Sequence, residues 1–173
     1  IMTTTGYATA DFNLWPQFSK GLLLLLMLVG ACAGSTGGGL KVSRAVMLFK
    51  MIGGEIRKLL HPRSVSSVRF EGKTVDVATQ KSVGNYFAIY VICMAAVWLL
   101  LSLDAFDTET NLAATISCFN NIGPALGAAG PAGSYAGYSQ LSKVVLSLAM
   151  LLGRLEIFPL LLTLWPSTWT SRH

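Results

Sequence analysis

Residues 107–123, with the sequence DTETNLAATISCFNNIG, contain a helical pattern that is too short to cross a membrane. Asp107 or Thr108 can cap the first turn. Apolar residues recur at i, i+4 and i+7, at Leu112, Ile116 and Phe119. Pro124 prevents the helix from continuing. The pattern therefore predicts a helix of about twelve residues followed by an extended stretch, since a true span needs about 20.

A short helix that enters the bilayer, stops and returns through an irregular strand has the form of a pore loop. Non-helical backbone at that depth persists only where it lines water or protein. The stretch TTTGY at residues 3–7 is predicted to be an equivalent strand, because Thr favours an extended backbone and Gly6 can orient its carbonyl freely. Rings of such carbonyls replace the water around a dehydrated cation.

An internal repeat relates these two regions. SKGLLLLLMLVG at 19–30 and SKVVLSLAMLLG at 142–153 align without gaps, at an offset of 123 residues. Each copy follows a polar, glycine-containing segment. The repeat indicates one structural unit used twice: a membrane helix, a re-entrant segment and a second membrane helix.

The composition favours a membrane protein, because 53% of residues are hydrophobic and 12% are charged, against about 25% charged in soluble domains. Residues 83–103 carry no charge and match the length of a span. Residues 144–165 have that length too but contain Arg154, Glu156 and Pro159. The apolar run at 21–34 is shorter and reaches only about 21 Å.

The basic residues predict the topology. Nine of the thirteen Lys and Arg residues lie between Lys41 and Lys81, which places this connector in the cytoplasm by the positive-inside rule. Asp104, Asp107 and Glu109 then lie outside, and the C-terminal tail returns to the cytoplasm. An alternative interpretation of the basic run is a solvated loop that binds no partner.

The stretch MLVGACAGSTGGGLKVSR at 27–44 contains a glycine-rich break, from Ala33 to Gly39, that interrupts the first helix. It fails the Walker A pattern because Leu40 precedes Lys41 and Val42 follows it. The break predicts a helix interrupted within the bilayer, next to a cavity. It is a candidate gate below the filter strand, and the alternative is a structural kink. The gate would comprise Gly34, Ser35, Thr36, Gly37, Gly38 and Gly39.

Arg154 aligns with Ala31 in the repeat, beside the start of this break. An intramembrane arginine is costly and normally faces a cavity or a partner. We expect Arg154 to form an electrostatic barrier in the pore or to anchor the glycine-rich segment. An ion pair with Glu156 is the alternative, but residues two apart on a helix face different directions.

Together the motifs CAGSTGGGLKVSR, TTGYATADF, FNNIGPALG and MLLGRLEIF resemble the TrkH subfamily of the Trk/Ktr/HKT potassium transporters. The resemblance implies an all-α membrane protein of helix–pore loop–helix repeats, K+ channel-like, with a broken helix and re-entrant filter loops. It implies four such units around one pore, of which this chain holds the end of the third and all of the fourth. We therefore interpret the chain as a piece of a longer protein, with N-terminal units missing.

The resemblance further implies K+ uptake across the bacterial inner membrane by a multi-pass protein. Filter positions would be Thr4, Thr5 and Gly6 in the third unit and Asn121, Ile122 and Gly123 in the fourth, with the gate at Gly34–Gly39 and Arg154. K+ would be the transported ion, and no cofactor and no enzymatic activity are expected. The expected partners are membrane lipid, a second copy in a homodimer and a cytosolic nucleotide-binding regulatory subunit of TrkA type, but no nucleic acid.

The predicted organisation follows from these assignments. It comprises the end of the third pore loop with its filter strand (1–16), the broken helix with the gate (17–53), a cytoplasmic connector (54–82), the first helix of the fourth unit (83–103), the fourth pore helix and filter (104–138), the second helix (139–166) and a cytoplasmic tail (167–173). The alternative function is a broken-helix secondary transporter of another solute or Na+.

Overall fold

The described part of the chain is mostly helical. The computed structural model describes residues 1, 3–30, 39–61, 68–70 and 72–155. Its helices are α1 (Gln17–Leu28), α2 (Val42–Leu60), α3 (Val77–Leu101), α4 (Thr108–Phe119) and α5 (Gln140–Arg154), with short 3-10 turns η1 (Phe12–Leu14), η2 (Gly127–Ala129) and η3 (Tyr135–Gly137).

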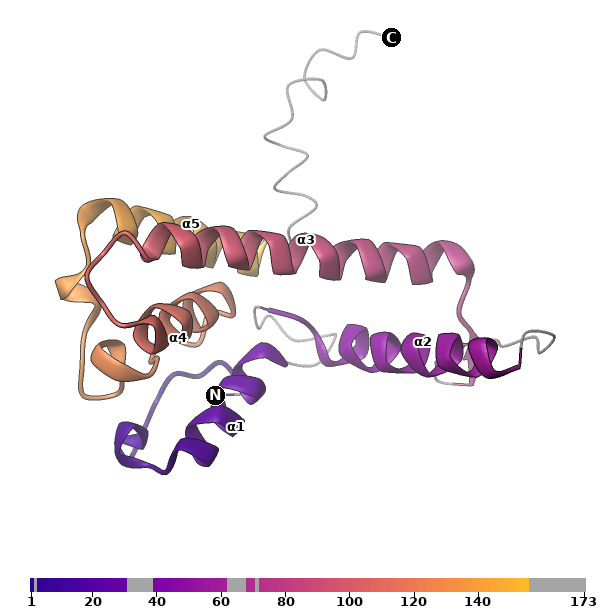
Figure 1. The fold of residues 1–173 in the computed structure, drawn as a ribbon, viewed down its shortest axis with the longest axis horizontal. Helices are drawn as coiled ribbons and strands as arrows, with labels where there is room; N and C mark the ends of the chain where they lie inside the picture. The colour runs from indigo at the N-terminus through magenta and orange to yellow at the C-terminus, as the bar shows by residue number, and fades with distance from the viewer. Residues whose placement is uncertain (2, 31–38, 62–67, 71, 156–173) are drawn as a thin grey trace, which may run out of the picture.

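Helix α3 is the longest element and organises the others. Figure 1 shows α4 and α5 beside its C-terminal half and α2 along its N-terminal half. The sequence predicted that this helix begins at Val83, but it begins at Val77. The polar residues before the apolar run also form helical hydrogen bonds. Among the described helices, only α3 is both long and apolar enough to cross a membrane.

Helix α4 lies at the centre and packs against α1, α3 and α5. It ends at Phe119, and its predicted capping residue Asp107 accepts a hydrogen bond from the Thr110 amide at 3.4 Å. Polar side chains of α4 are buried together with the apolar ones, since Thr115 and Ser117 are fully buried. The short helix is therefore surrounded by protein on nearly all sides.

The buried polar groups of α4 are satisfied by the loops that follow it. The hydroxyl of Ser117 donates to the carbonyl of Pro124 at 2.9 Å, and the hydroxyl of Tyr138 donates to Oδ1 of Asn111 at 3.0 Å. Buried polar groups need such partners because they have lost water. The loop after α4 is thus held on the helix that precedes it.

The repeat detected in the sequence is visible in the helices. Helices α1 and α5 begin at Gln17 and Gln140, at the offset of 123 residues that aligns the two copies. Their ends differ: α1 stops at Leu28, and α5 continues to Arg154. After α1, Val29 forms an isolated parallel bridge with Leu40, so the first copy leaves the helix at Leu28, before the break predicted at 33–39.

The predicted connector at 54–82 is shorter than expected because both flanking helices extend into it. Helix α2 continues to Leu60, and between it and α3 lies an antiparallel hairpin of β1 (Arg69–Phe70) and β2 (Lys73–Thr74). Nζ of Lys50 donates to the Arg69 carbonyl at 2.9 Å and ties the hairpin to α2. Within the predicted helix at 139–166, residues 156–166 lie outside the described part.

Candidate functional site

The two predicted filter segments have the same unusual backbone conformation. Thr4 and Asn121 have φ angles of 53° and 56°, and two residues later Gly6 and Gly123 have φ angles of 78° and 107°. In the described chain, Thr4 and Asn121 are the non-glycine residues with positive φ. This conformation costs about 1–2 kcal/mol per non-glycine residue and clusters at functional sites. The shared pattern shows that both segments are built alike.

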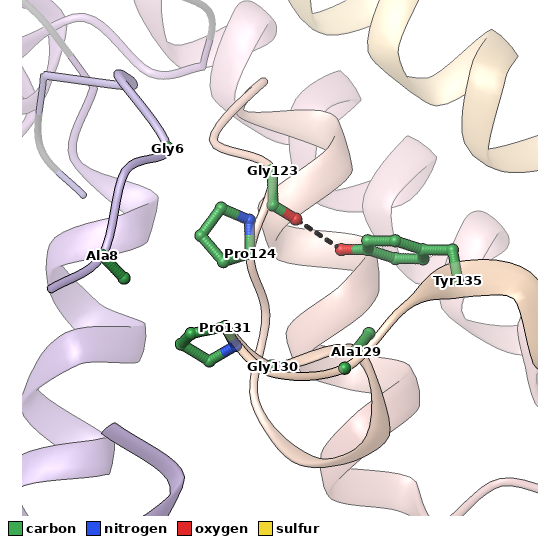
Figure 2. Close-up of a pocket in the computed structure, with 9 residues that line it drawn as sticks. Gly6, Ala8, Gly123, Pro124, Ala129, Gly130, Pro131 and Tyr135 are labelled. Atoms are coloured by element: carbon green, nitrogen blue, oxygen red, sulfur yellow. Dashed lines mark hydrogen bonds between the residues drawn. The ribbon is translucent and has the colours of Figure 1, made fainter. Parts of the chain in front are cut away.

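The two segments also lie side by side (Figure 2). A Cβ placed on Gly6 would lie 2.5 Å from the carbonyl oxygen of Ile122 and 3.6 Å from Cδ of Pro124, so only glycine fits at position 6. A pocket of about 330 Å³ lies between the two segments. It is lined by Gly6, Ala8, Gly123, Pro124, Ala129, Gly130, Pro131, Gly133 and Tyr135.

The segment after α4 is held from behind by hydrogen bonds. The amide of Ile122 donates to the Ser117 carbonyl at 2.9 Å, and the hydroxyl of Tyr135 donates to the Gly123 carbonyl at 2.7 Å. Figure 2 shows that the Gly123 carbonyl points toward Tyr135 and away from Gly6. The carbonyl oxygen of Ile122, in contrast, lies against Gly6.

The side chain of Asn121 is likewise engaged, because its Nδ2 donates to the carbonyl of Met150 in α5 at 3.0 Å. This bond ties the segment to α5. The C-terminal end of α4 carries about half a negative charge from the helix dipole, which favours a cation near residues 120–123.

The acidic side chains gather at the opposite end of α4. A hydrogen bond from the Thr110 hydroxyl at 2.7 Å lowers the pKa of the Asp107 carboxyl. The pKa of Asp104 is lowered as well, chiefly by the Ser142 hydroxyl and then by the Ser139 amide, which donates at 3.1 Å. Both carboxylates are thereby kept ionised at the N-terminal end of the helix, where the dipole favours negative charge.

A side chain joins the loops that follow the two segments. Nδ2 of Asn13 donates to the Gly127 carbonyl at 3.0 Å, and the Gly127 amide donates to Oδ1 of Asn13 at 2.9 Å. The neighbouring Phe12 is buried in the main core cluster. The two loops are thus fixed to each other as well as to their own helices.

The predicted gate falls largely outside the described residues. This applies to Gly34, Ser35, Thr36, Gly37 and Gly38. Gly39 is described and buried, and its amide donates to the carbonyl of Gly153 at 3.4 Å. Gly153 directly precedes Arg154, which lies exposed at the end of α5. The end of the glycine run and the backbone beside Arg154 therefore meet.

Sequence reasoning missed the side chains that hold the segments in place. Asn13 gave no signal because its partner lies 114 residues away. Tyr90, whose hydroxyl donates to the buried Oδ1 of Asn120 at 2.9 Å, offered a weak one. It is four residues from Tyr86 in the uncharged part of α3, and two tyrosines on one face of such a helix indicate buried polar partners.

Known proteins resemble the chain over nearly its whole length. The sequence model of the TrkH family, described as cation transport protein, matches residues 1–171. The Trk system potassium uptake protein TrkH of Vibrio parahaemolyticus is 37% identical over 171 residues, which are 99% of this chain and 35% of that protein. TrkH of Escherichia coli is 35% identical over 169 residues, covering 98% and 35% respectively.

The fold agrees with a solved relative. The crystal structure of the potassium transporter TrkH from Vibrio parahaemolyticus matches with a TM-score of 0.86 at 36% identity, covering 97% of this chain and 36% of that chain. This chain spans about a third of the length of these relatives. They are transport proteins of the membrane and not enzymes. The match over residues 1–171 shows that the chain belongs to the TrkH family of cation transport proteins.

Proposed function

We propose that this chain supplies two adjacent parts of the pore of a potassium uptake protein. Segment 4–6 and segment 121–123 would each contribute backbone carbonyls to a K+ filter. The relatives carry the name potassium uptake protein, which supports K+ as the transported ion. Na+, which the sequence left open, is the competitor to test. No catalytic step and no cofactor enter this mechanism.

The observation that carries the proposal is the matched backbone of the two segments. Thr4 and Asn121 hold the same strained φ, and Gly6 packs against the carbonyl of Ile122. Strain of this kind persists only when the surroundings impose it. Two segments with the same strained backbone, side by side, are expected in a pore built from repeated units. The direction of the α4 dipole adds support, since its negative end lies at the segment that would bind the cation.

For gating we propose the glycine run at 34–39 together with Arg154. Support comes from the hydrogen bond between Gly39 and Gly153, which brings the end of the run beside the arginine. Deletion of residues 34–39 in the complete protein should raise the K+ flux if the run obstructs the ion path. A flux at the wild-type rate would reduce the run to a structural kink.

The location and partners are proposed from the family resemblance. We place the protein in the bacterial inner membrane as a multi-pass protein, with four units around one pore and two copies in a dimer. The basic region at 41–81 would face the cytosol and a nucleotide-binding regulatory subunit of TrkA type. Co-purification of that subunit with the complete protein, and its loss when basic residues of this region are neutralised, would test the assignment.

A flux experiment tests the function directly. The complete protein is reconstituted in vesicles, and influx of K+, Rb+ and Na+ is measured separately. We expect K+ and Rb+ to enter much faster than Na+. The variant Gly6→Ala should lose this preference, because an added Cβ meets the Ile122 carbonyl and φ is 78°. The control Gly84→Ala adds the same atom to α3, where nothing lies within 4 Å. Equal influx of the three ions in the wild type would contradict the proposal.

A further inference from the structure

Asn120 follows the last residue of α4 as its C-cap and directly precedes the segment proposed as a filter. Its side chain is fully buried and has partners at both ends. Nδ2 donates to the Ile116 carbonyl at 2.8 Å, and Oδ1 accepts from the Tyr90 hydroxyl at 2.9 Å. A buried amide with both ends engaged has one stable orientation, because any rotation leaves a polar atom without a partner.

The ring of Tyr90 is itself fixed. It is 2% exposed and meets Phe119 edge-on, with ring centres 5.1 Å apart and planes at 89°. On the other side it stacks with Tyr86 at 6.5 Å. Its hydroxyl therefore reaches Asn120 from a rigid position on α3.

Gly39 packs directly against the side chain of Asn120. A Cβ on Gly39 would overlap Oδ1 of Asn120 and lie 2.8 Å from its Cγ. The Asn120 side chain thus fits between Tyr90 and a glycine backbone, with no space to swing away from the helix end. Since Asn121 is the next residue, the orientation of Asn120 constrains the backbone that begins the segment.

We propose that Tyr90 and Asn120 are positioning residues that set ion selectivity by holding the backbone of Asn121–Gly123. The inference rests on the proposed filter function. In it, the buried Tyr90 hydroxyl on α3 fixes the backbone position of that segment. Without the hydroxyl, Oδ1 of Asn120 is left unsatisfied at a buried position, and because its side chain has no space to turn aside, the change is transmitted to the backbone that carries it. The backbone at Asn121 shifts with it, and carbonyl placement changes the preference for one cation over another.

The decisive variant is Tyr90→Phe in the complete protein, because it removes one oxygen and keeps the ring. K+ and Na+ influx into reconstituted vesicles are measured together with thermal unfolding in detergent. We expect K+ influx to persist while the K+/Na+ influx ratio falls about three- to tenfold, the range expected for loss of one buried hydrogen bond.

Tyr138→Phe is the matched control. It breaks the same kind of buried bond, from the Tyr138 hydroxyl to Asn111, at the opposite end of α4. It should lower the unfolding temperature to a similar extent and leave the K+/Na+ ratio unchanged. Equal ratios in Tyr90→Phe, Tyr138→Phe and wild type would show a merely structural bond and overturn the inference.

A double-mutant cycle tests whether Tyr90 acts through Asn120. Asn120→Leu alone should lower the ratio, and adding Tyr90→Phe should lower it no further, because the acceptor is already gone. Additive losses would overturn the coupling between the two residues. A wild-type protein that passes K+ and Na+ equally would refute the proposed filter. A selective wild type with an equally selective Tyr90→Phe variant would refute only the inference about Tyr90.

Discussion

The side-chain amide of Asn13 binds the backbone amide and carbonyl of Gly127, with distances of 2.9 and 3.0 Å, across 114 residues of sequence. Because each end of the amide group is used, the bond fixes both the distance and the angle between the loops that follow the two filter segments. Gly6 and Ile122, which precede these loops, are held side by side as a result.

Replacing Asn13 by Ala should loosen this junction. Two hydrogen bonds are lost, each contributing about 1 kcal/mol, so we expect a lower unfolding temperature and a lower K+/Na+ influx ratio in the complete protein. Thermal unfolding in detergent and vesicle influx are the measurements. Thr9→Ala, at an exposed side chain of the same loop, serves as the control. If Asn13→Ala matched this control in both assays, the junction would have no part in placing the segments.

Gly153→Ala should destabilise the protein because α5 crosses the end of α4 at this glycine. A Cβ there would overlap the carbonyl oxygen of Phe119, which is backbone and cannot turn aside. Overpacking of this kind costs about 1–3 kcal/mol. Gly53→Ala in α2, where nothing lies within 4 Å, should be neutral or stabilising by up to about 1 kcal/mol. The unfolding temperature should therefore fall in Gly153→Ala and stay the same or rise in Gly53→Ala, and an equal shift in both variants would contradict the close approach.

Asp107 should make the stability of α4 depend on pH. Its pKa is lowered in the folded protein by the Thr110 hydroxyl, so its contribution is complete above the unfolded pKa of about 3.9 and is lost as pH falls through the folded value. Asp107→Asn keeps a side-chain oxygen for the cap and does not titrate. We expect the stability of the wild type relative to Asp107→Asn to be constant above about pH 5 and to fall as the pH drops below about 4.

The same site offers a test at neutral pH. Asp107→Ala removes the cap and should cost about 1 kcal/mol, whereas Asp107→Asn should cost little. Unfolding temperatures of the three proteins, measured at each pH, separate the cap from the charge. A difference between wild type and Asp107→Asn that did not vary with pH would show that the carboxylate does not stabilise the helix through its charge.

Arg154→Ala should raise K+ influx through the complete protein. A positive charge about 4 Å from the ion path repels K+ by about 4 kcal/mol at an effective dielectric near 20. Arg154→Lys retains the charge and should stay close to the wild type. An unchanged or lower influx in properly folded Arg154→Ala would count against the barrier. If Arg154 instead anchors the glycine run, K+ influx should be reduced in both Arg154→Ala and Arg154→Lys.

Much of the architecture was predictable because apolar runs, capping residues and repeats are local features of the sequence. The apolar run around Tyr90 predicted α3, and the capping pattern at Asp107 with the block at Pro124 predicted α4. The repeat predicted that α1 and α5 begin at equivalent positions. Helix ends were less predictable, since α2 and α3 continue beyond their apolar residues into polar sequence. Propensity alone does not mark where such a helix stops.

Local sequence patterns specify the elements and their order: short segments that cannot span, each followed by an apolar helix. How the two segments meet depends instead on the packing of the helices. The contact of Gly6 with Ile122, the Asn13–Gly127 bond and the bond from Tyr90 to Asn120 all join residues at least 30 positions apart. Hydrogen bonds of this kind depend on packing between helices and leave no periodic pattern in the chain, so they could be found only once the helices were placed.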